Sequence, residues 1–364
     1  MIILNDLHLG VSRKAGVTPA SSEALRTYIF EQFRRLLNQS KGEDLLIAGD
    51  LFDQFEVAPR DWFETYFYLS EWLYEPGNKL TLVAGNHDHS PKAARMSSFR
   101  MLAGVLDQQH GDSVRVIDTN EYACAAPGVW AVAHHDNQDM FDVALKALMD
   151  LTKDGDFLVL HANYDNKFAE QSDHSLNVSN DVARDFGNKG VHLVFAHEHQ
   201  HRSEIPVGAN ATHPGVTIMG NQFPTSVSDC LGNDQKRFHF IDRTSDGRLG
   251  IGFQACWHHY ENGFIQIDWH DLDEEHVLHN FIRITGEATA AEASEVINTI
   301  HRFRQKCSAD VFVVSNAVKV DGIVESEELP EAFEAANTFD VLDYIYKQLE
   351  PTELKVVQKI VEGL

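Results

Sequence analysis

Carboxylate, amide and imidazole side chains recur in five short motifs between residues 6 and 199. Each motif directly follows an apolar run with the length and composition of a buried β-strand. In chain order the motifs are Asp6-Leu7-His8, Gly49-Asp50-Leu51-Phe52-Asp53, Gly85-Asn86-His87-Asp88, the single His161, and His197-Glu198-His199. The carboxyl ends of parallel strands meet at one edge of a sheet, where open α/β folds bind their ligands. We therefore expect these side chains to converge on one site.

The mixture of donors indicates a metal centre. Asp, Asn and His supply oxygen and nitrogen ligands that suit Mn, Fe or Zn, and there are enough of them to hold two ions. Two ions roughly 3.5–4 Å apart need a bridging anion, which a carboxylate such as Asp50 can provide. A water held between them loses a proton near neutral pH and can attack phosphorus in line. One DxH or HxH pair is a weak signal, but five motifs in order favour a two-metal hydrolase.

Length and composition are those of an ordinary globular protein. The chain has 364 residues, of which 43% are hydrophobic and 23% charged, and this length suggests about two domains. No apolar stretch approaches the ~20 residues that a membrane span needs, and Asp6 and His8 interrupt any signal-type apolar run at the N-terminus. The four cysteines have no CxxC spacing, which is typical of reduced thiols. We expect a cytoplasmic protein that makes no contact with membranes.

The formal net charge of −25 argues against a surface that holds nucleic acid through its own field. Divalent metal ions would reverse the sign of the charge locally. The net charge of the protein therefore opposes binding of a phosphate-containing polymer, whereas metal ions at the site would favour it.

Helical patterns alternate with the predicted strands. Between residues 59 and 74, seven large apolar residues cover more than one face of a predicted helix: Trp62, Phe63, Tyr66, Phe67, Leu69, Trp72 and Leu73. Two interpretations stay open. The helix is wedged into the core, or its second face makes a homodimer contact.

The pattern changes after the last motif. Short strands at 216–219, 238–241, 249–253 and 264–267 suit a second sheet packed behind the first. After an acidic linker at 268–275, a strand at 281–284, a helix at 293–303 and a strand at 311–314 predict a βαβ unit. An acidic loop at 321–334 precedes terminal helices with apolar stripes. We expect domains at 1–270 and 276–325 and a C-terminal helical segment at 335–364.

In their order and spacing the five motifs resemble the signature of the calcineurin-like metallophosphoesterase superfamily. The resemblance implies an α/β fold with four layers, in which two mixed β-sheets are flanked by helices. It also implies two groups of metal ligands that share Asp50. These are Asp6, His8, Asp50 and His199 for one ion, and Asp50, Asn86, His161 and His197 for the other.

The same resemblance implies roles for three residues that are not ligands. His87 would stabilise the pentacoordinate phosphorus or protonate the leaving oxygen, and Asp53 would orient His87 by a hydrogen bond. Asp88 would hold the loop. The sequence departs from the family pattern at Ala196, where the family usually has glycine before HxH.

Within the superfamily the chain is most similar to the SbcD-like nuclease subunits of double-strand-break repair complexes. Leu9-Gly10 continues the first motif as in that group, and Gly220 to Ser226 stands where the group has a Gly-Ser-x-x-x-x-Ser segment, with Asn221 in place of Ser. The βαβ unit matches the group's small capping domain, which lies over the active site. The short chain also matches viral versions, so a phage protein acting in the host cytoplasm is one expectation.

This finer resemblance implies a Mn²⁺-dependent DNA exonuclease with single-strand endonuclease activity, with Mg²⁺, Fe²⁺ or Zn²⁺ as alternative metals. It implies a homodimer that works with an SbcC-like ATPase, which would supply the basic DNA-binding surface that this chain lacks. The helices at 335–364 would dock that ATPase, or they would pack on their own domain.

Two rival hypotheses remain. A phosphatase or phosphodiesterase for small nucleotides would use the same ligands, and the negative charge favours it. A non-catalytic scaffold is disfavoured by the complete ligand set and His87.

Overall fold

The computed structural model describes residues 1–11, 15–16, 19–89, 95–166, 176–210, 212–231, 236–257, 263–273, 279–308 and 310–320. The acidic loop predicted at 321–334 and the helices predicted at 335–364 lie outside the described residues. Their docking on a partner or on their own domain therefore stays a prediction.

The first sheet is built around three apolar segments from the start of the chain. β1 (Ile2–Leu4), β2 (Asp44–Ala48) and β3 (Lys79–Val83) pair in parallel. The strand order is β14-β13-β1-β2-β3-β4, in which β4 (Val114–Ile117) is parallel to β3. The other edge is an antiparallel pair, β13 (Lys236–Arg243) and β14 (Leu249–Trp257). The central strands are buried on both faces, which explains their nearly continuous apolar sequences.

A second sheet has the order β11-β12-β10-β7-β6-β5. Its inner strands are parallel to one another, and both edge strands are antiparallel to their neighbours. The strands are β5 (Tyr122–Ala126), β6 (Val129–Val132), β7 (Phe157–His161), β10 (His192–Ala196), β11 (Arg202–Glu204) and β12 (Val216–Ile218). A separate short pair, β8 (Asn163–Tyr164) and β9 (Asn177–Val178), follows β7.

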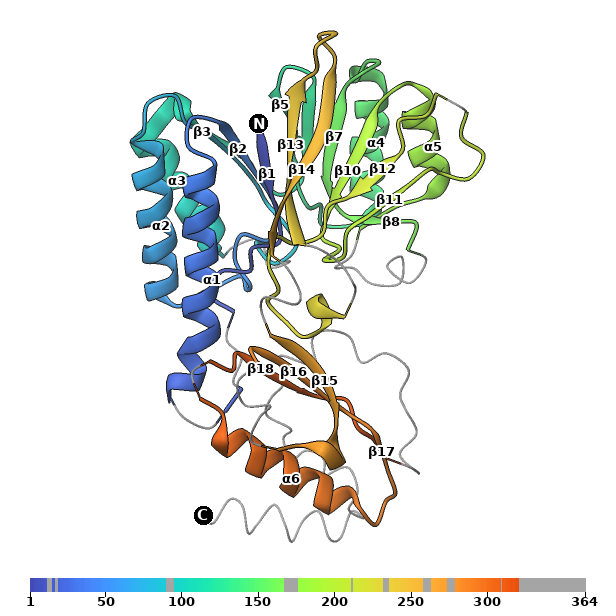
Figure 1. Ribbon diagram of the computed structural model, residues 1–364. Helices are drawn as coiled ribbons and strands as arrows, with labels where there is room; N and C mark the ends of the chain where they lie inside the picture. Colours follow the sequence, from blue (N-terminus) through green and yellow to red (C-terminus); the bar gives the residue numbers. More distant parts are fainter. Residues whose placement is uncertain are drawn as a thin grey trace, which may run out of the picture.

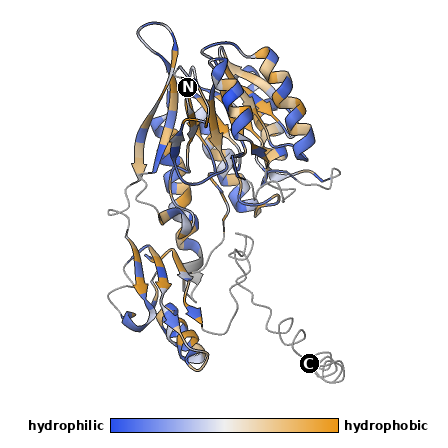
Figure 2. Ribbon diagram, turned by 90° about the vertical axis from the view of Figure 1, so that its right-hand side faces the viewer, coloured by the Kyte–Doolittle hydropathy of each residue, from blue (hydrophilic) through white to orange (hydrophobic). Residues whose placement is uncertain are grey.

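Helices cover the outer faces of both sheets (Figure 1). The first sheet is flanked by α1 (Pro19–Gln39), α2 (Pro59–Leu73) and α3 (Ser98–His110), and the second by α4 (Gln138–Leu151) and α5 (Asn180–Asn188). One buried cluster joins the helices α1, α2 and α3 to both sheets, and another joins α4 and α5 to the second sheet. Figure 2 shows mixed hydrophobic and hydrophilic residues along the helices, as expected of elements that bury one face. The predicted four-layer α/β sandwich is confirmed.

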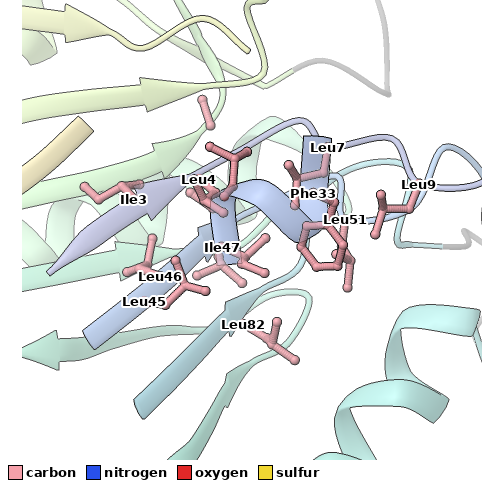
Figure 3. Close-up of a cluster of buried hydrophobic side chains, with 14 of the residues drawn as sticks. Ile3, Leu4, Leu7, Leu9, Phe33, Leu45, Leu46, Ile47, Leu51 and Leu82 are labelled. Carbon is pink, nitrogen blue, oxygen red and sulfur yellow. The ribbon is translucent and has the colours of Figure 1, made fainter. Parts of the chain in front are cut away.

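The core reaches the ends of the strands that carry the motifs. Figure 3 shows Leu7, Leu9 and Leu51 packed near Phe33 of α1, beyond the ends of β1 and β2. These three leucines are fully buried. Burying a leucine side chain stabilises the fold by roughly 1.5–3 kcal/mol, so each one anchors the loop to which it belongs.

A smaller unit lies beyond the sheet edge at which β1 ends (Figure 1). Its sheet contains β15 (Phe264–Asp268), β16 (Phe281–Thr285) and β18 (Val313–Asn316), all parallel, with α6 (Ala293–Lys306) packed against it. β17 (Glu287–Ala288) and β19 (Lys319–Val320) form a short extra pair. β16, α6 and β18 are the βαβ unit expected from the sequence. The division into domains at 1–270 and 276–325 stays a prediction.

An aromatic contact joins the small unit to α1. The ring of Tyr28 stacks on Phe312, with centroids 4.8 Å apart and planes 28° apart, and meets Phe281 edge-on at 6.2 Å. Phe281 and Val313 belong to the same buried cluster as the first sheet. The small unit therefore shares part of the main core.

The expectation that the strands after residue 215 form one second sheet is wrong. β12 belongs to the second sheet, β13 and β14 extend the first, and β15 joins the small unit. The cause is pairing between distant segments, since β13 aligns His239 with Ile3 of β1. An apolar pattern indicates that a strand exists but not which distant strand completes its hydrogen bonds.

The aromatic helix α2 is buried on only one side. Leu69 and Trp72 are in the core, whereas Phe63 is 60% and Phe67 52% exposed. The interpretation of a helix wedged into the core is therefore wrong. No helix within the described ranges is long and apolar enough to cross a membrane.

His239 of β13 predicts a pH-dependent stability. It is 2% exposed and neither ring nitrogen has a hydrogen-bond partner among the described residues. Burial, followed by the nearby His201 and Arg237, lowers its pKa to about 3. The folded state therefore binds fewer protons than the unfolded state, so stability is lost as pH falls below about 6.5.

We predict that His239→Leu makes the unfolding free energy fall less steeply between pH 6.5 and 4, since one such group contributes a slope of at most about 1.4 kcal/mol per pH unit. Urea unfolding followed by tryptophan fluorescence measures the slope. The control is His301→Gln, at an exposed position on α6. Equal slopes for wild type and His239→Leu would contradict the prediction.

Candidate metal centre

Four of the predicted ligands have a backbone conformation that is rare for residues with side chains. The φ angles of Asp6, His8, Asp50 and His197 are 49°, 45°, 47° and 82°. Each such residue costs roughly 1–3 kcal/mol and persists only where its surroundings hold it. Here the loops that carry the first two motifs are joined by main-chain hydrogen bonds. The amide of His8 donates to the carbonyl of Asp50 at 3.1 Å, and the amide of Asp6 donates to the carbonyl of Gly49 at 3.2 Å.

Two glycines of the motifs leave space for the ligands. A Cβ atom on Gly49 would lie 2.0 Å from Nδ1 of His161, and one on Gly85 would lie 2.1 Å from Oδ1 of Asp50. Gly49 also has a φ of 87°. Neither position can hold a larger residue without displacing a predicted ligand.

Asp6, His8 and His199 form the first ligand group. Their donor atoms lie within 4.8 Å of one another. The Nε2 atoms of His8 and His199 are 3.1 Å apart, and Oδ1 of Asp6 is buried without a hydrogen-bond partner among the described residues. A buried carboxylate oxygen without a partner is costly unless a cation satisfies it.

Asp50, His161 and His197 form the second group. Asn86 joins them through its side-chain oxygen, which lies 2.8 Å from Nε2 of His161 and 3.0 Å from Nδ1 of His197. Oδ2 of Asp50 is 3.4 Å from Nε2 of His161. Nδ1 of His161 faces the carbonyl of Ala48 at 3.2 Å, so Nδ1 carries the hydrogen. Nε2 then keeps the lone pair that a metal ion would need.

The electrostatics of both groups favour a cation. Burial alone would lower the pKa of His161, but Asp50 and Asp6 raise it to about 9. The pKa of His8 is also raised, against burial, by Asp53 and Asp50. A proton is the simplest cation that these carboxylates can attract, and the same negative potential attracts a metal ion. The mixed oxygen and nitrogen donors and the unpartnered oxygen of Asp6 fit a pair of divalent ions.

His87 lies beside these groups with its ring held in one orientation. Its Nδ1 is 2.5 Å from the main-chain carbonyl of Asp53, which can only accept, so Nδ1 carries a hydrogen. Nε2 therefore remains available, 4.0 Å from Oδ2 of Asp50. The side chain is 38% exposed, which leaves it accessible to a substrate.

The contacts of Asp53 differ from those that the resemblance implied. Its main-chain carbonyl, not its carboxylate, accepts the hydrogen bond from His87, while the carboxylate lies 3.3 Å from Nδ1 of His8. Asp53 thus contacts both His87 and a predicted ligand. A main-chain contact of this kind leaves no mark in the sequence.

Asp88 holds two motif loops together, as expected. It is 2% exposed and accepts hydrogen bonds from the amides of Gly85 at 3.0 Å, Phe52 at 3.3 Å and Leu51 at 3.4 Å. Burial and the charge of Asp50 raise its pKa to about 7.

The sequence motifs missed two residues that contact the ligands. Asn5 donates to Oδ2 of Asp6 at 2.5 Å, and Oδ1 of Asp229 lies 2.8 Å from Nδ1 of His199. Burial would raise the pKa of Asp229, but His199, Lys236 and the amide of Thr225 lower it well below its usual range. Asp229 lies 30 residues beyond His199, and no motif in the sequence marks it.

Comparison with known protein families agrees with the placement of the motifs. A family model described as calcineurin-like phosphoesterase matches residues 1–201, more than half of the 364-residue chain. The matched region runs from β1 to just beyond His199 and so includes every predicted ligand. No curated protein matches the chain.

We predict that His87→Ala binds two metal ions but hydrolyses a nitrophenyl phosphodiester about 10²–10⁴-fold more slowly, because the expected role of His87 is to act on the substrate and not to hold metal. Asp50→Ala is the contrasting variant and should bind both ions weakly, because Asp50 is the expected bridge. Elemental analysis after dialysis measures the bound metal. Fewer ions in His87→Ala than in wild type would contradict its role, and two tightly bound ions in Asp50→Ala would contradict the bridge.

Proposed function

We propose, from the premise that the chain belongs to the calcineurin-like phosphoesterase family, that it is a DNA phosphodiesterase. Membership of the family indicates a metal-dependent hydrolase. The finer proposal is a Mn²⁺-dependent exonuclease with single-strand endonuclease activity, acting as the nuclease subunit of an SbcCD-like repair and recombination complex.

The observation that carries this proposal is the position of the small unit beyond an open metal-binding edge. Side chains at this edge remain partly exposed, 38% for His87 and 19% for both Asp53 and His199. β1 ends toward the small unit, which is fastened to α1 by the stacking of Tyr28 on Phe312 (Figure 1). An open site next to the small unit suits a polymeric substrate that extends beyond the site, whereas a small ligand is usually enclosed on most sides.

Separate residues of this chain would hold the metal ions and act on the substrate. When bound, a pair of divalent ions supplies an activated water and neutralises charge on the phosphoryl oxygens. Asp6, His8, Asp50 and His199 would hold one ion, and Asp50, Asn86, His161 and His197 the other. His87, whose Nδ1 hydrogen is fixed by the carbonyl of Asp53, presents Nε2 to the phosphoryl group or the leaving oxygen. Fixing the ring in advance avoids reorganisation during the reaction.

The net charge of −25 requires a source of positive charge for DNA binding. Metal ions supply it at the reacting phosphate but not along a duplex. We assign the remainder to an SbcC-like ATPase partner, with residues 335–364 as its docking segment. The free thiols of all four cysteines suit the reducing cytoplasm, of a host cell if the protein is phage-encoded.

A second candidate function is hydrolysis of small nucleotides by the same centre. The strongly negative charge favours it, because a small substrate needs only local attraction by the metal ions.

We predict that the protein degrades end-labelled DNA with Mn²⁺ faster than with Mg²⁺, and that His87→Ala abolishes most of this degradation. Single-stranded DNA, duplex DNA, cyclic nucleotides and nucleotide sugars are compared at equal concentrations. DNA should be cleaved fastest. Turnover of a cyclic nucleotide or nucleotide sugar with intact DNA would favour the second candidate and contradict the nuclease.

The outer face of α2 supports a homodimer. Phe63 and Phe67 lie one helical turn apart and are 60% and 52% exposed. Met101 of the adjacent α3 is 42% exposed. Tyr66 and Tyr74, in contrast, make contacts within the subunit. Both hydroxyl groups lie 2.6 Å from the side chain of Gln109 of α3, and Tyr66 also stacks on Trp62 at 5.7 Å. An exposed apolar face of this kind is typical of a subunit contact.

We predict that Phe63→Glu with Phe67→Glu gives a folded monomer, since charge on this face opposes its burial. Hydrolysis of a nitrophenyl phosphodiester should remain, because the metal ligands lie on other segments, while processing of duplex ends falls. The matched control is Val143→Glu with Leu151→Glu, at residues of α4 that are 69% and 46% exposed. Light scattering measures the mass. A wild-type chain that is monomeric at micromolar concentration would contradict the dimer.

A further inference from the structure

The segment from Gly220 to Asp229 lies beyond the family match. It contacts His199 of the first ligand group directly and reaches Asp6 through Asn5. Gln222 exchanges hydrogen bonds with Asn5, whose amide nitrogen donates to Asp6 at 2.5 Å. At the other end of the segment, Asp229 contacts His199 at 2.8 Å. The segment thus supports a site whose ligands come from the other end of the chain.

From these contacts we infer that Asp229 is a positioning residue that selects the metal-binding tautomer of His199. The inference rests on the binuclear centre of the proposed function but not on its substrate. Asp229 does not touch the reacting atoms, because it lies behind His199 and is 4% exposed.

The two oxygens of Asp229 have different partners. Oδ2 accepts from the amide of Thr225 at 2.8 Å, the amide of Ser226 at 2.9 Å and the Thr225 hydroxyl at 3.0 Å. Oδ1 faces only Nδ1 of His199 in the described hydrogen bonds. Two main-chain N–H groups can only donate, so Oδ2 must be an acceptor and the orientation of the carboxylate is fixed.

The tautomer of His199 follows from this arrangement. Oδ1 accepts, so Nδ1 of His199 carries the hydrogen and Nε2 keeps its lone pair. That Nε2 points at the first ligand group, 3.1 Å from Nε2 of His8. Lys236 holds the same loop from the other side, because its ammonium group donates to the carbonyl of His199 at 2.8 Å. A ligating histidine depends on such a partner for its tautomer and ring orientation.

An isosteric substitution separates this role from simple packing. In Asp229→Asn the amide oxygen must take the position of Oδ2, because two N–H groups face it. The amide NH₂ group then points at Nδ1 of His199, which must accept. The ring hydrogen moves to Nε2, the atom needed for metal binding. The variant keeps the shape of the side chain and reverses the tautomer.

The test measures metal binding and the tautomer without any nucleic acid. Equilibrium dialysis with Mn²⁺ gives the number and affinity of bound ions, and ¹⁵N NMR of the Zn²⁺-loaded protein reports which nitrogen of His199 carries the hydrogen. In wild type, His199 should carry it on Nδ1. In Asp229→Asn one ion should bind about 10–100-fold more weakly, with changed ring signals for His8 and His199 and unchanged signals for His161 and His197.

Asp136→Asn is the matched control. Asp136 also contacts a histidine, since its Oδ1 lies 2.8 Å from Nε2 of His89, but it is 43% exposed and His89 is not a predicted ligand. Two ions bound by Asp229→Asn as tightly as by wild type, or an equal loss in Asp136→Asn, would overturn the inference. A hydrogen on Nε2 of wild-type His199 would also overturn it, and this result does not require any variant to fold. If the protein cleaved small nucleotides instead of DNA, the proposed nuclease would fail while these measurements stood.

Discussion

The structure depends on one constraint, the gathering of predicted metal ligands, most of them buried, where a cation would stabilise them. The Nε2 atoms of His8 and His199 face each other at 3.1 Å, and Oδ1 of Asp6 has no hydrogen-bond partner among the described residues. Left-handed backbone at Asp6, His8, Asp50 and His197 adds strain that the surrounding core must offset. The fully buried leucines between the ligands, Leu7 and Leu51, provide that support.

Residues that support the candidate metal centre extend beyond the part of the chain that the family model matches. The match to the family ends at residue 201, yet Asp229 contacts His199, and Gln222 contacts Asn5, which in turn donates to Asp6. The same segment leads into β13, which pairs with β1 next to the first motif. The chain therefore returns to its own beginning to complete the first ligand group.

The gathering of the predicted ligands could be anticipated from the sequence, because each motif follows an apolar strand and parallel strands bring their carboxyl ends to one edge. The partners of β13, β14 and β15 could not be predicted, because apolar alternation does not identify a distant neighbour. Asp229 was missed for a similar reason, since it has no local motif and its contact with His199 exists only in the folded chain. The hydrogen bond to His87 comes from a main-chain carbonyl, which every residue possesses.

Electron paramagnetic resonance of the Mn²⁺-loaded wild-type protein directly tests whether the five motifs form one binuclear centre. Two ions that share a bridging carboxylate are magnetically coupled, whereas separate ions give independent signals. We expect two Mn²⁺ ions per chain with the spectrum of a coupled pair. A single bound ion, or two ions without coupling, would contradict it.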